Sequence, residues 1–523
     1  MKNVVSVLFL FLITNLSYAQ THLLSGGTVL TEHDVITGLE VPWEILWGTD
    51  NHIWCTERKG KISRINPETG NKQDLINLDP QVAGGISESG MLGMALHPNF
   101  PATPRVFVAY IYFQGYSAEL GMRIISLEYN GTALVNPQTL LEDIPANDMS
   151  VGGRMLITEE EKLLVTVGDM NMVGSSLEPT GHLGKVLRLN LDGSIPADNP
   201  DPSSYVFTLG HKNPQGLANG PQGSIFCSEI GSYTDDEINE LIGGANYGYP
   251  IVSGDCNTDS EIFYCEANNV REPLGFWLPN MGLNGMSFYN HPAIPEFSNS
   301  LLIGGVGNPT NEYRGLYKFK LSEDLHSIIN VESLLTSYGM IRDVCINPHT
   351  GSIYVATNGF SHPGMQPNRI IELSNESYIP ESAPGSGHQD PFIHTDHLLH
   401  PNYVLPGSEI IILGGNTIKG IKKNAQINPD TDVYPQKKGA EYTAHQYMIC
   451  YPNPTDNILY LSFSPSFIGE SYQIFSYQGR LLLQTDITDV EMTLDISKLP
   501  AGNYYIKASN KLGTISKTIQ VAH

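Results

Sequence analysis

Short stretches in which hydrophobic and polar residues alternate recur along the chain between residue 20 and about residue 375. Each recurrence has a short apolar stretch, a turn with polar or glycine residues, and a second alternating stretch. Alternation with a period of two predicts β-strands, and no helical heptad is sustained in this part of the sequence. Six apolar stretches begin the recurrences, at residues 52–58, 105–112, 162–169, 224–231, 300–307 and 352–359. Most have a recognisable partner strand, at residues 61–66, 122–129, 185–190, 314–321 and 369–373.

The spacing of these recurrences predicts how the strands assemble. They lie roughly 50 to 75 residues apart, which is too long for solenoid repeats and suits four strands with their loops. We therefore expect a six-bladed β-propeller over residues 20–375, with a pair of β-sandwiches as the alternative. A propeller gathers loops from different blades around one central channel, so we expect functional residues just after the inner strands.

After residue 375 the sequence changes character. Residues 376–445 begin with a segment rich in Pro, Gly and Ser and contain one short apolar stretch, SEIIILGG. This composition predicts a linker with a small β segment. Residues 446–523 alternate again, with Gln-Gly and Ala-Gly pairs where turns are expected, which predicts a small antiparallel β-sandwich. The expected fold class is all-β, with a six-bladed propeller followed by this sandwich.

The first nineteen residues, 1–19, have the pattern of a signal peptide. Lys2 supplies a positive charge, residues 4–16 are apolar, and Ser17 and Ala19 place small residues before a cleavage site. The apolar run has about 13 residues, whereas a membrane span needs about 20, so a membrane anchor is the weaker alternative. No later segment is long and apolar enough either. We expect an exported, soluble chain that begins at Gln20 and is not an integral membrane protein.

The charge balance argues against one class of partner. Of the 523 residues, 54 are Asp or Glu and 29 are Lys or Arg, which gives a formal net charge of −25. A chain this acidic repels phosphate backbones, so we expect no nucleic acid partner. The 51 Gly and 34 Pro residues indicate many tight turns between short strands.

The cysteines suggest structural roles. Cys55, Cys227 and Cys345 each lie in a short apolar run, where a free thiol behaves as a small buried hydrophobe. Cys256 and Cys265 lie nine residues apart in a polar segment, a spacing that a local disulfide can close. No Cys/His cluster has the spacing of a zinc site.

The C-terminal region resembles a known targeting domain. It contains YPNP at residues 451–454, a Gln-Gly turn, LPAGNYYIK at residues 499–507 and a closing strand with Lys-Thr-Ile. In their order and spacing these elements resemble the C-terminal sorting domain of type IX secretion in Bacteroidetes, here residues 446–523. The resemblance implies that the type IX secretion machinery is a partner and that the protein is secreted or held at the cell surface. A generic immunoglobulin-like module that binds carbohydrate is the alternative.

The propeller region resembles a family of enzymes. It contains MLGMALHPNF, VGGRM, VTVGDM, GHKNPQGLA, DDEIN with NYGYP, and MIRDVCIN. These blocks closely resemble the soluble PQQ-dependent glucose/sorbosone dehydrogenases, also called aldose sugar dehydrogenases. The resemblance implies a six-bladed propeller that oxidises the anomeric hydroxyl of an aldose sugar to a lactone. The implied cofactors are pyrroloquinoline quinone (PQQ), which accepts the hydride, and calcium, which holds the quinone.

This chemistry explains which residue types the site needs. The hydroxyl proton needs a general base, and a quinone with three carboxylates needs cationic side chains and a hard cation with oxygen ligands. As catalytic residues the resemblance implies Asp169, which orients the base, and Ser150 at the position of the base. As cofactor-binding residues it implies Glu88, Lys212, Asn213 and Arg342. As metal ligands it implies the carbonyls of Gly231 and Ser232, with Asp235, Asp236, Glu237 and Tyr247 at a further, structural calcium. A turn Asp at 169 and a solvated acidic turn at 235–237 are the alternatives, and we expect His211 and Gln215 to be structural supports.

The sequence departs from the family pattern at the base and at the cations. Ser150 stands where the family has a histidine, Lys212 replaces an arginine and Met340 replaces a second arginine. The loop GVGNPTNEYRG lacks the expected lysine. Two functions remain open: a sugar dehydrogenase with a substitute base such as Asp148 or His182, or a non-catalytic propeller that binds carbohydrate or protein.

Overall fold

The computed structural model describes two compact units, residues 1–425 and 426–523, which are taken separately below. The described residues are 20–84, 88–114, 119–172, 174–232, 234–308, 312–359, 368–379, 448–451, 458–463, 467–476, 480–489, 491–500, 502–510 and 513–521. The expected signal peptide at 1–19 and the expected short strand near residues 408–415 lie outside them.

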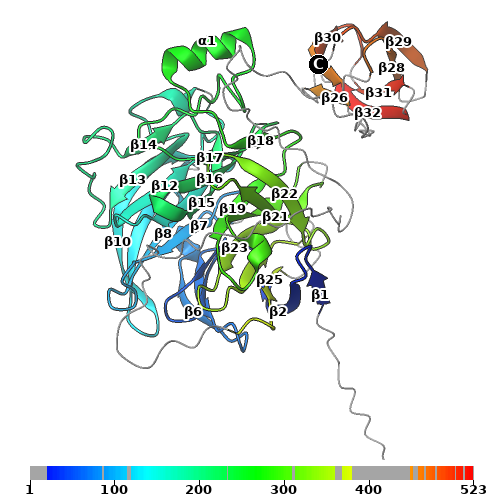
Figure 1. Ribbon diagram of the computed structural model, residues 1–523. Helices are drawn as coiled ribbons and strands as arrows, with labels where there is room; N and C mark the ends of the chain where they lie inside the picture. Colours follow the sequence, from blue (N-terminus) through cyan, green and yellow to red (C-terminus); the bar gives the residue numbers. More distant parts are fainter. Residues whose placement is uncertain are drawn as a thin grey trace, which may run out of the picture. The chain divides into compact units, whose positions relative to one another are not determined.

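The described part of the first unit is built from six antiparallel sheets (Figure 1). The first four-stranded sheet contains β3 (Pro42–Trp47), β4 (Ile53–Glu57), β5 (Lys61–Ile65) and β6 (Lys72–Asn77). The second contains β7 (Met91–Leu96), β8 (Arg105–Phe113), β9 (Leu120–Tyr129) and β10 (Leu134–Ala146). The third contains β11 (Gly152–Ile157), β12 (Lys162–Val167), β13 (Lys185–Asn190) and β14 (Val206–Leu209). The fourth contains β15 (Asn213–Asn219), β16 (Ile225–Ile230), β17 (Asp236–Glu240) and β18 (Gly275–Trp277). The fifth is β19 (Leu283–Tyr289), β20 (Ser300–Val306), β21 (Arg314–Leu321), β22 (Ile328–Leu334).

The sixth sheet joins the beginning of this unit to its end. It has five strands in the order β1 (Gln20–Leu23), β2 (Val29–Leu39), β25 (Asn368–Ser374), β24 (Ile353–Thr357) and β23 (Ile341–Ile346). Strand β2 pairs with β25, so Thr31 lies opposite Ser374. Segments more than 300 residues apart in the chain therefore share one set of backbone hydrogen bonds.

The first strands of the six sheets form a closed series. Strands β3, β7, β11, β15, β19 and β23 each contact the next in this order, and β23 contacts β3. The stretches predicted from the sequence are the second and third strands of these sheets, such as β4 with β5. The first strands lie before the predicted pairs and were not among the strands predicted from the sequence.

Glycine allows the first strands to approach one another closely. A Cβ atom on Gly93 in β7 would lie 2.2 Å from the carbonyl oxygen of Gly153 in β11. No side chain fits at that distance, so only glycine permits this contact. Glycine also interrupts the alternating hydrophobic pattern of β7, β11, β15 and β19, which all contain it.

Several connections meet at one end of the sheets. Because neighbouring strands are antiparallel, the connection into a first strand lies at the same end as the connection between the second and third strands. At this end, which we call the loop end, lie the connections at 58–60, 147–151, 168–184, 210–212 and 231–235. They carry most of the residues discussed below.

An insertion between β17 and β18 carries a helix that the sequence analysis did not predict. Helix α1 (Asp259–Asn268) begins with a capping box, in which the Thr258 side chain accepts from the Glu261 backbone and Glu261 reaches back. A disulfide joins Cys256 to Cys265, which confirms the predicted local bridge. The thiols of Cys55, Cys227 and Cys345 are free and buried, as predicted. Short 3-10 helices are η1 (Asp79–Gln81), η2 (Ser175–Leu177), η3 (Pro221–Gly223) and η4 (Pro295–Phe297).

The second unit contains two antiparallel sheets in its described residues. One has β26 (Met448–Tyr451), β27 (Ile458–Phe463) and β30 (Glu491–Asp495); the other has β29 (Leu481–Asp486), β28 (Ser471–Ser476), β31 (Gly502–Asn510) and β32 (Gly513–Val521). Leu461 of the first sheet and Ile474 and Ile506 of the second belong to one buried cluster. Among the described residues of the whole chain, none of the helices has the length and hydrophobicity that a membrane crossing needs.

Candidate active site

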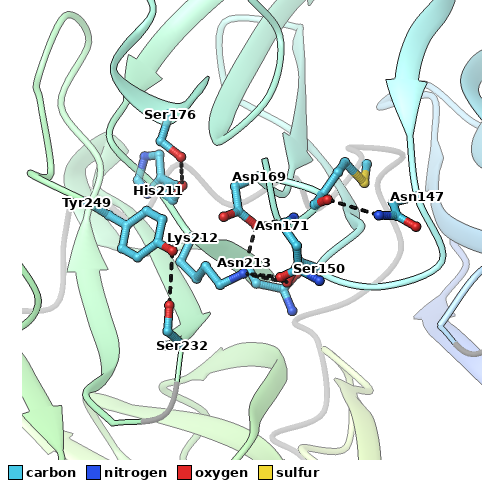
Figure 2. A network of polar contacts seen from close by, with 12 residues as sticks. Asn147, Ser150, Asp169, Asn171, Ser176, His211, Lys212, Asn213, Ser232 and Tyr249 are labelled. Atoms are coloured by element: carbon cyan, nitrogen blue, oxygen red, sulfur yellow. Dashed lines mark hydrogen bonds and ion pairs between the residues drawn. The ribbon is translucent and has the colours of Figure 1, made fainter. Parts of the chain in front are cut away.

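Lys212 is the centre of a buried polar network at the loop end (Figure 2). It lies in the short connection between β14 and β15. Its Nζ donates to Ser150 Oγ at 2.7 Å, to Asp169 Oδ1 at 2.8 Å and to Asn171 Oδ1 at 2.8 Å. An ammonium group has three N–H bonds, so all three are used within the chain.

Asp169 follows strand β12 and supplies the negative charge of this network. Its side chain is fully buried, and its backbone N–H donates to the Lys212 carbonyl at 2.7 Å. Oδ1 also accepts from the Asn171 backbone N–H at 2.9 Å. Oδ2 is buried and has no hydrogen-bond partner among the described residues. Asp169 and Lys212 thus compensate each other's charge away from water, as buried ions require.

Ser150 is held in a strained backbone conformation. Its φ of 54° lies in the left-handed region, which costs energy for a residue other than glycine. Its backbone N–H donates to Glu88 Oε2 at 3.0 Å, and its hydroxyl donates to Asn171 Oδ1 at 3.2 Å. These contacts bring Glu88 to the same place as Ser150 and Lys212, although the three are far apart in sequence.

His211 and Asn213 are the neighbours of Lys212 in the sequence, and both form buried hydrogen bonds next to the network. The His211 ring is fully buried, with Nδ1 at 2.9 Å from Glu229 Oε2 and Nε2 at 2.9 Å from Thr208 Oγ1. Asn213 Oδ1 accepts from the Gly152 N–H at 3.1 Å and from Gln215 Nε2 at 2.8 Å. These contacts agree with the expected supporting roles of His211 and Gln215.

Two guanidinium groups lie near Glu88. Arg342 in β23 donates from Nη1 to Asn284 Oδ1 at 3.0 Å, and Arg58 after β4 donates from Nη2 to the Ser89 carbonyl at 2.9 Å. Burial, with the charge of Arg58 adding to it, lowers the pKa of Arg342 to about 10, while Glu88 opposes the shift. Burial also lowers the pKa of Arg58, again opposed by Glu88. The charges of Glu88, Arg58 and Arg342 therefore interact with one another.

The acidic turn holds loops together through its carboxylates. Asp236 is fully buried, and its Oδ2 accepts from the N–H groups of residues 281, 282 and 283 at 2.8, 2.6 and 3.1 Å. Its Oδ1 accepts from the Gly231 N–H at 3.0 Å. Burial raises the pKa of Asp236 to about 7, although these N–H groups lower it. Glu237 accepts from the Gly254 N–H at 2.7 Å and from Asn239 at 3.1 Å.

The other predicted metal ligands point to separate partners. Asp235 accepts from Thr234 Oγ1 at 2.7 Å, the Tyr247 hydroxyl donates to the Glu240 carbonyl at 2.6 Å, and the Gly231 carbonyl accepts from Asn280 at 3.3 Å. Ser232 Oγ lies 3.0 Å from the Tyr249 hydroxyl. Calcium takes six to eight oxygen ligands, and the acidic turn does not offer such a set because its carboxylates are engaged with N–H donors. In the part of the chain that the structure describes, no group of three or more His, Cys, Asp or Glu side chains could hold a metal.

Three residues of the network are missing from the residues inferred from the sequence. Arg58 ends a predicted apolar strand, where a buried charge is unusual and is itself a signal. Asn171 lies two residues after Asp169, and Tyr249 lies within the NYGYP block.

The side chains of the two alternative bases, Asp148 and His182, do not join the network of Figure 2. The Asp148 carbonyl accepts from the Glu88 N–H at 2.8 Å, and His182 packs against Tyr205 with ring centroids 6.3 Å apart.

Two family models match the chain. One, described as Glucose / Sorbosone dehydrogenase, matches residues 39–364, and the other, described as Secretion system C-terminal sorting domain, matches residues 449–522. Both resemblances expected from the sequence are thereby confirmed.

Individual proteins are similar to the first unit. Quinoprotein glucose dehydrogenase B of Acinetobacter calcoaceticus is 37% identical over 249 residues, which are 42% of this chain and 52% of that protein. The match thus spans about half the length of that relative. Aldose sugar dehydrogenase of Escherichia coli (strain K12) is 26% identical over 337 residues, 61% of this chain and 88% of that protein. The solved PQQ-bound form of aldose sugar dehydrogenase from Streptomyces coelicolor has a TM-score of 0.56 and 25% identity, covering 65% of this chain and 96% of that one.

Proposed function

This chain belongs to the glucose/sorbosone dehydrogenase family, and we propose that it is an exported quinoprotein-type sugar dehydrogenase that oxidises the C1 hydroxyl of an aldose to a lactone. The observation that carries the proposal is the convergence of residues from separate sheets at the loop end. Glu88, Ser150, Asp169 and Lys212 form one connected network, next to which Asn213 accepts from the Gly152 N–H. The guanidiniums of Arg58 and Arg342 lie in the same charged environment as Glu88. We further propose that the six sheets are the blades of a propeller and that the two sheets of the second unit pack as a sandwich.

The donor set at the loop end fits an anionic cofactor such as PQQ. When bound, PQQ supplies a quinone that accepts a hydride, and its carboxylates need cationic partners. Arg58 and Arg342 would hold them, because two partly compensated guanidiniums near one carboxylate favour a further anion. Lys212 would contribute charge but no hydrogen bond in this conformation, since its three N–H groups are donated to chain oxygens. For calcium we propose only the carbonyls of Gly231 and Ser232.

The targeting segments support export. The sorting-domain match at residues 449–522 supports passage through the type IX secretion machinery to the cell surface or the medium. We propose that residues 1–19 act as the signal peptide for the earlier step across the inner membrane. Gln20, where we expect the mature chain to begin, is the first residue of β1.

A second candidate is a non-catalytic propeller that binds carbohydrate or protein at the same end. It is favoured by one observation: the position expected for a histidine base holds Ser150, whose hydroxyl is bonded to Lys212 and Asn171. A serine hydroxyl does not take a proton at neutral pH without help.

Cofactor binding and turnover distinguish the two candidates. We expect full-length protein with PQQ and calcium chloride to reduce a dye when glucose or another aldose is added, with the absorption spectrum of bound PQQ changing. Arg342→Met should weaken PQQ binding at least about tenfold in calorimetry, because it removes a carboxylate partner. Arg123→Met, whose guanidinium pairs with Glu142 at 2.7 Å on the surface, is the matched control. Wild-type protein that binds no PQQ at micromolar concentration would instead support the non-catalytic binder.

A further inference from the structure

The six first strands share an irregularity close to the loop end. In each of them the pairing with the second strand shifts register within the first four residues of the first strand. A β-bulge shifts the register in this way and re-aims nearby side chains, often beside a functional site. The third residue of each first strand lies in the shifted part or at its edge. These six residues are Glu44, Gly93, Arg154, Gln215, Gly285 and Asp343.

Three of these residues are charged and form a buried group, which we call the inner cluster: Glu44, Arg154 and Asp343. Arg154 Nη1 lies 2.7 Å from Glu44 Oε1 and 3.1 Å from Asp343 Oδ2, and none of the three side chains is more than 4% exposed. Arg154 Nε donates to the Gln215 carbonyl at 2.8 Å. Glu44 Oε2 accepts from the Met94 N–H at 3.4 Å. The inner cluster thus contacts strands β3, β7, β11, β15 and β23.

Glycine at two of the third positions makes room for the inner cluster. A Cβ atom on Gly285 of β19 would lie 1.9 Å from Asp343 Oδ1 and 2.7 Å from Arg154 Nη2. A Cβ atom on Gly93 of β7 would lie 3.1 Å from Arg154 Cα. The inner cluster therefore lies against all six first strands. Because a buried ion cluster adds little net stability compared with apolar side chains of similar volume, stability alone does not account for it.

Arg342 connects the inner cluster to the loop end. It is the residue between the shifted pairs of β23 and the peptide neighbour of Asp343. Its Nη1 donates to Asn284 Oδ1 at 3.0 Å, and Asn284 is the peptide neighbour of Gly285. Strands β19 and β23 thus each place one residue against the inner cluster and the preceding residue in the Arg342 contact. Burial is the main cause that lowers the pKa of Arg342, and the charges of Arg154 and Asp343 also act on it.

We infer that the inner cluster positions Arg342 for the anionic ligand of the loop end, with Asp343 and Arg154 as positioning residues. This inference rests on the proposed function, which supplies PQQ as that ligand. Arg154 holds the Asp343 carboxylate, so β23 cannot move at its register shift without breaking this contact. Position and charge predict opposite effects of Asp343. Its negative charge by itself weakens the binding of an anion nearby, whereas its hold on β23 strengthens that binding.

Calorimetric titration of the full-length protein with PQQ in calcium chloride separates the two effects. We expect Asp343→Asn to weaken PQQ binding about tenfold, within the loss that a displaced side chain can cause. Unchanged or tighter binding would overturn the inference. Arg154→Lys keeps the charge but loses the planar fork, and it is measured beside Asp343→Asn with the same expectation. If neither variant folds, the inner cluster is needed for folding itself, and the inference is overturned.

A double variant tests whether Asp343 acts through Arg342. Arg342→Met/Asp343→Asn should bind PQQ no more weakly than Arg342→Met alone, because the group to be positioned is already absent. Additive losses would contradict action through Arg342. Glu240→Gln is the matched control, because Glu240 is also a buried carboxylate paired with a guanidinium, that of Arg271 at 2.5 Å, and it ends β17 away from the loop end. It should leave PQQ binding unchanged, and a loss equal to that of Asp343→Asn would overturn the inference.

A crystal structure of cofactor-free Asp343→Asn tests the position of Arg342 without any ligand. We expect its guanidinium to lie beyond hydrogen-bond distance of Asn284 Oδ1, from which Nη1 is 3.0 Å away in the wild type. An unmoved guanidinium would overturn the inference whether or not PQQ binds. Wild-type protein that binds no PQQ would instead overturn the proposed function, so the two failures are distinguishable.

Discussion

At the scale of single residues, the buried Asp169–Lys212 ion pair holds together loops at the loop end. Both side chains are buried, and the ammonium also bonds Ser150 and Asn171. A buried ion pair contributes little net stability as a whole, but removal of one partner leaves the other charge without compensation. The pair therefore fixes the geometry of three loops more than it stabilises the fold.

Removal of the cation tests this view of the pair. Lys212→Met should lower the free energy of unfolding by about 3–5 kcal/mol, because the Asp169 charge stays buried and unpaired. The double variant Lys212→Met/Asp169→Asn should lose less than the sum of the two single variants. Urea unfolding measures both.

The control for this pair is a surface pair of the same chemistry. Arg123 and Glu142 lie 2.7 Å apart with their side chains 26% and 45% exposed. Arg123→Met should change the free energy of unfolding by only about 0–1 kcal/mol. A Lys212→Met variant that loses no more than this would contradict the assignment of a buried, mutually dependent pair.

At the scale of elements, backbone N–H groups and carboxylates join connections that lie apart in the chain. Asp236, the first residue of β17, accepts from the 231 N–H and from three N–H groups of the connection into β19. Four donors on one carboxylate make it a structural clamp between two neighbouring sheets. The acidic turn that resembles a calcium site thus orders loops with the same oxygens that calcium would need.

The pKa of Asp236 predicts a pH dependence of stability. Its ordinary value is 3.8, and burial raises the value in the folded protein to about 7. Between these values the folded protein binds more protons than the unfolded chain. The contribution of Asp236 to stability is therefore fully present below about pH 4 and is lost as the pH rises through about 7.

Asp236→Asn should remove this dependence. We expect its plot of unfolding free energy against pH to be shallower than that of the wild type between about pH 4 and 7, by up to about 1.4 kcal/mol per pH unit. Urea unfolding at several pH values measures the slopes. Asp192→Asn, at an exposed turn, is the control and should run parallel to the wild type in this window. If the slope for Asp236→Asn also equals that of the wild type, the pKa of Asp236 is not raised by folding.

At the scale of the whole molecule, the chain combines a closed ring of sheets with a separate sorting unit. The pairing of β2 with β25 joins both ends of the first unit in one sheet, so closure depends on residues more than 300 positions apart. The sorting-domain match lies within the second unit, which has its own buried cluster. We therefore expect folding of the first unit and export to be separable properties.

Deletion of residues 446–523 tests this separation. We expect the shortened protein to keep a cooperative thermal transition of its first unit but to be nearly absent from the cell surface and the medium. Cell fractionation and immunoblotting measure where the shortened protein is found, with the full-length protein as the comparison. Equal amounts of both proteins outside the cell would contradict a sorting role of the second unit.

Much of the fold could be predicted from the sequence because strand signals are local. The second and third strands of the sheets alternate or are almost wholly apolar, as β8 is after Arg105, and their positions follow from neighbouring residues. Of the missed first strands, β7, β11, β15 and β19 contain glycine, as at Gly93 where the backbones approach closely, and this weakens their hydrophobic pattern. Helix α1 was missed although Thr258 and Glu261 carry the capping-box signature at the expected spacing.

The sequence by itself determined the all-β class, the local disulfide, both family resemblances and most residue types at the site. Only the tertiary structure decided what those residues contact. Lys212 was expected to meet a cofactor carboxylate, yet its Nζ donates to oxygens of residues 150, 169 and 171. The oxygens of Asp236 were expected to face calcium and accept backbone N–H groups instead. The physical reason is that a charged side chain buried by folding must find its counter-charge or hydrogen bonds among whichever groups the fold brings near it, and local sequence does not specify those groups.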